Sequence, residues 1–174
     1  MNPNALCLII IAGMTVPDVT AGTLAQDDVR DRIISATNTL MGRPDSPPTM
    51  ETIVDAVREL LDLSAAVTPD NEYKAEIESR IAVAKDRIRD QSLFDDKARQ
   101  YLSFAYRMMT EGRKWEMPQE LDEFVTPAEL QAKTLRYVER LIAQSLEALE
   151  DENTQDAARL LLEIVLMTIT PHPG

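Results

Sequence analysis

Apolar residues recur three and four positions apart along most of the chain, which is the repeat of an amphipathic α-helix. In the middle of the chain they stand at Tyr73, Ile77, Ile81, Ala84, Ile88, Phe94, Ala98, Tyr101, Leu102, Ala105 and Met108. No window after residue 26 sustains the alternation of apolar and polar residues that is typical of a half-buried β-strand. The pattern therefore predicts an all-α fold.

Capping residues, prolines and glycines divide this pattern into six segments. Thr126, followed by Pro127 and Glu129, has the sequence of a helix start in which the Thr side chain caps the first turn. Ser92-x-x-Asp95 and Thr68-Pro69-Asp70 are similar openings. Gly42 and Gly112 stand where helices are expected to end. The predicted helices cover about residues 27–41, 49–67, 70–90, 93–111, 127–150 and 154–169.

The second, fourth and sixth predicted helices share one register. In each, an Asp is followed three positions later by an Arg and three positions after that by a Leu, within 55–63, 96–104 and 156–164. Internal similarity of this kind is typical of repeated helical hairpins. It predicts a single domain over residues 26–174, built from three αα-hairpins at about 27–68, 70–112 and 127–170.

Two arrangements of the three hairpins fit this register. Stacked hairpins give a short solenoid, whereas closed packing gives a compact six-helix bundle. The last predicted helix is apolar on nearly every side between Leu160 and Ile169, so other helices must enclose it. The sequence therefore favours the closed bundle and predicts that Leu161 and Ile164 belong to its core.

The N-terminal segment has the pattern of an export signal. Residues 5–16 form a run of 12 residues without a charge, shorter than the ~20 of a membrane span but within the ~7–15 of a signal-peptide core. No Lys or Arg precedes this run, and small residues follow it up to Ala25. We expect residues 1–25 to be a signal peptide, with no membrane span in the mature chain and a periplasmic or secreted location, most simply in a bacterium. The alternative is a buried N-terminal helix or strand.

The charge balance restricts the partners. The chain has 30 Asp and Glu against 18 Lys and Arg, a net charge of −12. Binding to nucleic acid requires a dense cationic surface, and the longest basic run is Arg113-Lys114. DNA and RNA are therefore disfavoured, and the acidic surface suggests a cationic protein partner.

The scarcity of Cys and His restricts the chemistry. One Cys and one His, His172, leave no set of side chains for thiolate zinc sites or for catalysis by a His base. Chemistry that needs only carboxylates, such as glycoside hydrolysis, stays open because acidic residues are abundant. We expect a protein that is not an enzyme and that has no cofactor or metal.

Three arginines at the same position of the shared register are candidates for contact with a partner: Arg58, Arg99 and Arg159. Each can pair with the Asp three residues before it, which stabilises its own helix only weakly. The alternative is that they line a groove for an anionic ligand or for the carboxylates of a partner.

Trp115, the only Trp, is the fourth candidate. It lies in the long connection 112–126, where it either packs over the end of the bundle or anchors a partner. We expect it to pack there with the apolar residues of the same connection: Met117, Leu121, Phe124 and Val125.

These features lead to the hypothesis of an exported, acidic helical protein that acts by binding another protein. A carrier of a small ligand or a metal in the interior of the bundle is the competing hypothesis. Absorbance and metal content of the purified protein would distinguish the two.

Overall fold

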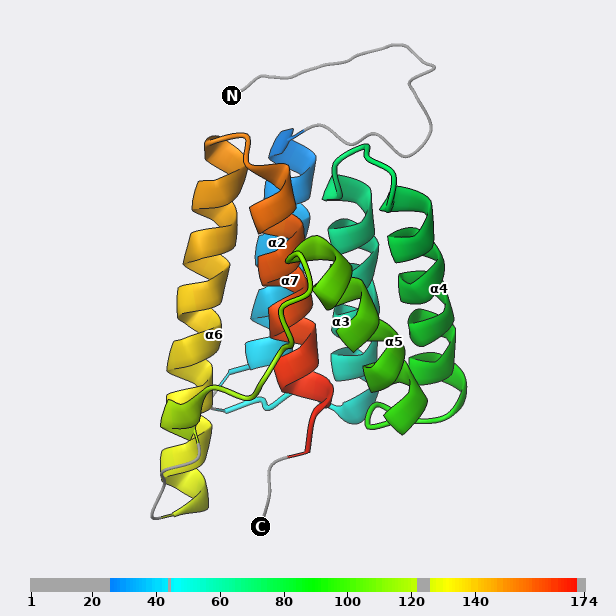
Figure 1. Ribbon diagram of the computed structural model, residues 1–174. Coiled ribbons are helices and arrows are strands. Elements are labelled where there is room, and N and C mark those ends of the chain that lie inside the picture. Colours follow the sequence, from blue (N-terminus) through cyan, green and yellow to red (C-terminus); the bar gives the residue numbers. More distant parts are fainter. Residues whose placement is uncertain (1–25, 44, 122–125, 172–174) are drawn as a thin grey trace.

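The computed structural model describes residues 26–43, 45–121 and 126–171 (Figure 1). The helices are α2 (Gln26–Met41), α3 (Met50–Val67), α4 (Lys74–Asp90), α5 (Asp96–Met109), α6 (Pro127–Glu150) and α7 (Thr154–Ile169). A short 3-10 helix, η2 (Gln119–Leu121), lies in the connection between α5 and α6. No β-strand occurs in this part of the chain, so the prediction of an all-α fold is confirmed. The predicted signal peptide, residues 1–25, lies outside the described residues.

Most helix starts follow the predicted capping residues, but α4 and α5 begin later than predicted. The Thr126 hydroxyl accepts a hydrogen bond from the Glu129 amide at 3.1 Å, as the sequence predicts. Helix α5 begins three residues later than predicted, because Asp95 caps it in place of Ser92. The Asp95 carboxylate accepts from the Ala98 amide at 2.9 Å and from Arg87 Nε at 2.7 Å, two bonds that fix the start of the helix.

The start of α4 also differs from the prediction. The sequence Thr68-Pro69-Asp70 was expected to open this helix, but α4 begins at Lys74. The Asn71 side chain accepts from the Tyr73 amide at 2.8 Å, and the Lys74 amino group donates to the Thr68 carbonyl at 2.7 Å. These local bonds hold the residues before Lys74 in a turn.

Helices α3 and α7 form the centre of the molecule. Helix α3 packs against α2, α4 and α7, whereas α7 packs against α3, α5 and α6. The outer helices also pair, α2 with α6 and α4 with α5. The six helices therefore form two four-helix rings that share the α3–α7 pair (Figure 1). A stacked solenoid would separate the first hairpin from the third, so these contacts identify the closed bundle.

The position of α7 explains its composition. Because other helices surround it, ten of its residues are buried, and Leu161 and Ile164 have no exposed surface, as predicted. Helices α3 and α7 approach closely at two small residues, where the Ser64 hydroxyl donates to the Ala158 carbonyl at 2.8 Å. None of the helices among the described residues is long and apolar enough to cross a membrane.

Gly42 follows the last residue of α2 and has a backbone conformation that favours glycine. Its φ is +66°, in the left-handed region that residues with a Cβ rarely adopt. A Cβ at this position would lie 2.4 Å from Pro48 Cδ. The turn into α3 therefore depends on Gly for two reasons, its conformation and the lack of space.

Candidate functional site

The three register arginines have different surroundings in the structure. Arg58 Nη1 donates to the Lys85 carbonyl at 2.6 Å and so ties α3 to α4. No ion pair joins Arg58 to Asp55 among the described residues. Because the Arg58 guanidinium is bonded to the backbone of a neighbouring helix, its role is explained by the packing of the bundle.

Arg159 is held in a partly buried network on α7. Its Nε and Nη2 donate to Asp156 Oδ1 at 2.9 and 2.6 Å, and its Nη1 bonds to Glu163. The Glu163 side chain is only 14% exposed, and this burial raises its pKa above the ordinary value, although Arg159 and Arg113 oppose the shift. These bonds tie Arg159 to groups of its own helix, although its side chain, 20% exposed, also lines two smaller surface depressions beside the start of α7.

Arg99 lies at the edge of an open hollow. Its guanidinium pairs with Asp96 and donates to the Phe94 carbonyl at 3.0 Å. The hollow has a volume of about 500 Å³. Helix α5 and the residues after it supply its walls: Asp96, Arg99, Gln100, Ser103, Phe104, Arg107, Lys114 and Trp115. We call this hollow the α5 groove. It brings together two of the four residues that the sequence singled out, Arg99 and Trp115.

Trp115 forms a wall of the α5 groove. Its side chain is half-buried and packs against the hydrophobic core, as does that of Met117, while Leu121 is fully buried. The expected packing of the connection onto the bundle is thus observed for these residues. Phe124 and Val125, which were expected to take part, lie outside the described residues.

The turn before Trp115 is well defined by hydrogen bonds. The Gly112 amide donates to the Arg107 carbonyl at 2.7 Å, and the Thr110 hydroxyl bonds to the Tyr106 carbonyl at 2.8 Å. The left-handed conformations of Glu111 and Gly112 reverse the chain at this point. Trp115 is therefore held in place by the end of α5.

Phe104 is the most exposed aromatic side chain of the groove. Half of it, 50%, is accessible to solvent. The guanidinium carbon of Arg80 lies 4.7 Å from the ring centroid and that of Arg107 lies 5.9 Å away, so both cations interact with its π-system. A half-exposed ring that contacts two arginines offers apolar surface in a fixed place.

The register of the three hairpins shows that this exposure is unusual for the fold. The positions equivalent to Phe104 are Leu63 in α3 and Ile164 in α7, and both are completely buried. Other helices cover those two residues completely, whereas the described helices cover only half of Phe104, to which α4 contributes the Arg80 side chain. The sequence analysis did not single out Phe104, because a large apolar residue at this position is indistinguishable from a core residue before the packing is known.

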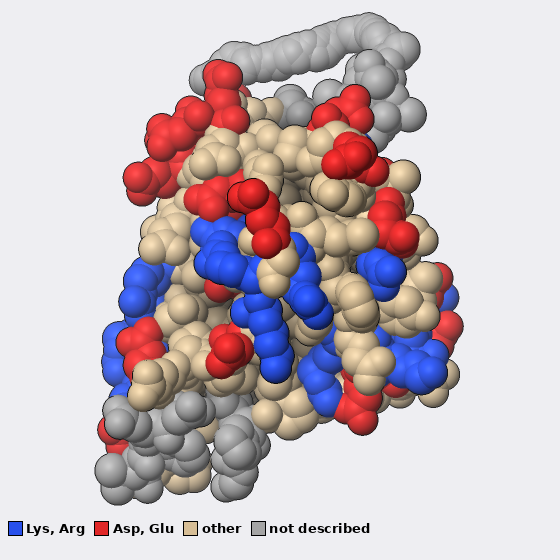
Figure 2. Space-filling model, in the orientation of Figure 1, with Lys and Arg blue, Asp and Glu red and all other residues tan. Residues whose placement is uncertain are grey.

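The α5 groove is cationic, although the chain is acidic. Three cations, Arg99, Arg107 and Lys114, line it with one carboxylate, Asp96. Arg107 and Lys114 form no ion pair with any described residue. Figure 2 shows Lys and Arg side chains gathered on the face that carries α5 and the following connection. The groove therefore combines apolar surface with positive charge.

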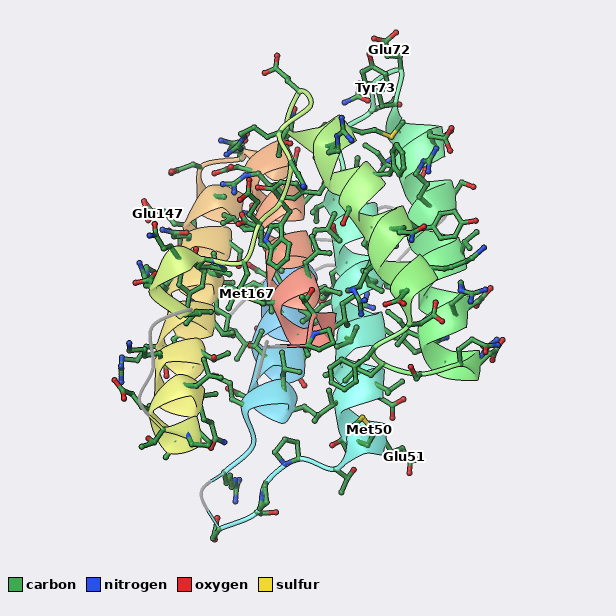
Figure 3. All side chains as sticks on the ribbon, turned by 60° about the horizontal axis from the view of Figure 1, so that its bottom comes forward. Met50, Glu51, Glu72, Tyr73, Glu147 and Met167 are labelled. Carbon is green, nitrogen blue, oxygen red and sulfur yellow. The ribbon has the colours of Figure 1, made fainter. Side chains whose placement is uncertain are left out.

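A second hollow, of about 470 Å³, opens where α2 and α7 end and α3 and α6 begin. Figure 3 brings this end of the bundle forward and labels Met167, which is one of its lining residues. Most of the lining is apolar and none of it is ionisable: Leu40, Met41, Ile53, Phe94, Leu135, Val138, Met167 and Pro171, with Thr134, Thr168 and Thr170. We call this hollow the apolar cavity.

The three Thr hydroxyls of the apolar cavity already donate to carbonyls of their own helices, at 2.6 to 2.8 Å. They can therefore only accept further hydrogen bonds. No group of three or more His, Cys, Asp and Glu side chains in the described part of the chain is arranged to hold a metal ion.

No protein-family model matches the sequence, and no curated protein or solved structure is significantly similar to the chain. The geometry of the two hollows is therefore the basis for a proposal about function.

Proposed function

We propose that this protein acts by binding another protein through the α5 groove. The observation that carries the proposal is Phe104, an aromatic residue that is half exposed at a register position where the two central helices have fully buried residues. An apolar side chain at such a place gains free energy when a partner removes it from water.

The composition of the α5 groove supports binding to a protein. Trp, Arg and other aromatic residues dominate the binding free energy of protein interfaces, and the groove contains Trp115, Phe104, Arg99 and Arg107. Trp115 is already packed against the core, so little conformational freedom is lost when a partner contacts it. The groove thus has the features of a preformed binding site.

The residues of the α5 groove do not form a catalytic arrangement among themselves. Its single carboxylate, Asp96, is paired with Arg99, and Ser103 has neither a His nor a Lys hydrogen-bonded to it in the described structure. We therefore propose a binding function for this site and not an enzymatic one.

We also propose that the protein is exported before it functions. The support is the uncharged run of residues 5–16, followed by small residues up to Ala25. Mass spectrometry of the native mature protein tests this proposal. A chain that begins near Gln26 is expected, and a membrane-bound product that still begins at Met1 would contradict it.

Site-specific photo-cross-linking tests the binding function. A photoreactive phenylalanine analogue at position 104 should form covalent adducts with one protein in the producing cells. Met50 is the matched control, because it is also exposed, at 56%, and does not line the groove. Adducts that form equally from positions 104 and 50, or from neither, would contradict the proposal.

The apolar cavity supports a second candidate function, the transport of a small neutral ligand. Its volume lies within the range of ~300–1,000 Å³ that is typical of small-molecule sites, and no charged residue lines it. Extraction of the purified native protein with organic solvent, followed by mass spectrometry, should release a bound neutral compound. A Val138→Trp variant, in which the ring fills part of the cavity, should release less of it.

A further inference from the structure

We infer that the partner protein presents a short acidic segment to the α5 groove, with at least one apolar side chain among its carboxylates. This inference rests on the proposed function. The inference depends on three features of the structure. They are the charge of the groove, its exposed aromatic surface and the acidity of the surface around it.

The charge of the α5 groove selects an anionic occupant. Asp96 neutralises Arg99, which leaves Arg107 and Lys114 without an ion pair to a described residue. Arg107 extends from the last turn of α5, and Lys114 follows in the connection. A guanidinium bonds most favourably to a carboxylate, because its planar fork matches the two oxygens. A carboxylate is therefore the group that these two cations recognise best.

The exposed aromatic surface argues against a small inorganic anion as the only ligand of the α5 groove. Phe104 remains 50% exposed beside Arg107, and Trp115 also lines the groove. An anion such as phosphate would bond to the cations but would leave this surface in water. An aromatic or aliphatic side chain next to the carboxylates covers it and gains the free energy of apolar burial.

The acidity of the remaining surface excludes a long polyanion. The chain carries a net charge of −12, and Figure 2 shows Asp and Glu side chains above and among the Lys and Arg side chains of this face. Electrostatic interactions extend only about 8 Å at physiological ionic strength. A nucleic acid or an anionic membrane would reach beyond the groove into this negative surface and be repelled, whereas a short acidic segment meets only the cations of the groove.

The positive charge of the α5 groove limits the expectation of a cationic partner, which rests on the net charge alone. The acidic surface outside the groove is suited to positive regions of a partner. Inside the groove, however, the sign of the charge is reversed. The partner therefore needs an acidic segment at the contact itself, whatever its overall charge.

Selection from a displayed library of random peptides tests the inference. The mature protein serves as bait, and the Phe104→Ala variant is used to remove peptides that bind elsewhere. We expect the remaining sequences to be enriched in Asp and Glu next to Phe, Trp, Leu or Ile. An enriched peptide should change the fluorescence of Trp115, the only Trp of the chain, and its affinity should fall as salt is added.

Two matched variants measure the part played by charge. Arg107→Glu should weaken binding of the selected peptide at least about tenfold, the effect of losing a central contact. Arg136→Glu makes the same change of charge at an exposed residue of α6 outside the groove, and should alter the affinity less than about twofold.

The possible failures can be told apart. If binding of the selected peptides requires Phe104 but the peptides are neutral or basic, the inference of an acidic segment is wrong. The proposal that the groove binds a protein then stands. If no selected peptide depends on Phe104, the binding function of the groove fails as well. Binding of single-stranded DNA or of phosphatidylglycerol vesicles that depends on Arg107 would also overturn the inference.

Discussion

Helices α5 and α7 contain the same register, Asp followed by Arg and then Leu, yet they meet different surroundings. In α7 the register lies at the centre of the bundle, where Arg159 bonds to Asp156 and Glu163 and where Ile164 is completely buried. In α5 the equivalent position holds Phe104, which is half exposed beside the α5 groove.

The comparison shows that neighbouring helices, and not the register, determine what a residue does. Helix α7 has α3, α5 and α6 around it, whereas α5 packs against α4 and α7 alone among the described helices. Ile164 of α7 therefore stabilises the core of the bundle. Phe104, at the equivalent position of α5, is available to a partner protein. The predictions below measure this difference, first through stability and then through binding.

The largest expected difference concerns Ile164 and Phe104. Ile164→Ala removes a completely buried side chain and leaves a cavity, so it should lower the free energy of unfolding by about 2–5 kcal/mol. Phe104→Ala should cost about 1 kcal/mol or less, because half of its side chain is already in water. Urea denaturation measures both changes. Equal losses would mean that Phe104 is a core residue and that the two helices do not differ.

A smaller difference is expected between Arg159 and Arg99. Arg159→Ala leaves the Glu163 carboxylate, which is 14% exposed, without its bonded cation and should cost about 1–3 kcal/mol. Arg99 pairs with Asp96, which is 79% exposed, so Arg99→Ala should cost about 1 kcal/mol or less. Chemical denaturation of both variants at neutral pH makes the comparison. A larger loss for Arg99→Ala would contradict the partly buried network in α7.

The pH dependence of stability reports on Glu163. Burial raises the pKa of this carboxyl in the folded protein above its ordinary value of 4.5, so the folded state takes up the proton more readily than the unfolded state. The resulting stabilisation is fully present below the unfolded pKa and is lost as the pH rises through the folded pKa. Glu163→Gln lacks this loss, and its stability relative to the wild type should increase as the pH rises from the ordinary value of 4.5 through the raised pKa of Glu163.

The control for this titration is Ser103→Ala, at the equivalent position of α5. Ser103 has no ionisable group, so the stability of this variant relative to the wild type should not change with pH. If Glu163→Gln instead became less stable relative to the wild type as the pH rises, the ion pair with Arg159 would outweigh burial in its effect on the carboxyl.

The sequence was sufficient for the helices and for most of the core. The spacing of apolar residues predicted the six helices, and the apolar run Leu160–Leu162 predicted the enclosure of α7, because a helix without a polar face must be covered. The start of α5 was predicted three residues early. The choice between Ser92 and Asp95 as the cap depends on Arg87, a bond between two different elements.

The candidate site was only partly predictable. Trp115 and Arg99 were singled out from the sequence, but Phe104, Arg107 and Lys114 were not. Arg and Lys are common on helix surfaces, and the pattern of apolar residues cannot show whether a neighbour covers Phe104. That information comes only from the packing of the helices.

The affinity of the captured partner for two charge-reversal variants tests the central claim, that the α5 groove is the binding site. Arg107 and Arg136 are both exposed helical residues without an ion pair in the described structure. Arg136→Glu should change stability by about 0.5 kcal/mol or less, and Arg107→Glu, which also loses the contact with Phe104 and a cation in the last turn of α5, by about 1–2 kcal/mol or less, so both variants stay folded. Isothermal titration calorimetry with the protein captured from position 104 should show binding at least about tenfold weaker for Arg107→Glu and within about twofold of the wild type for Arg136→Glu. Equal affinities of the two variants would contradict the account.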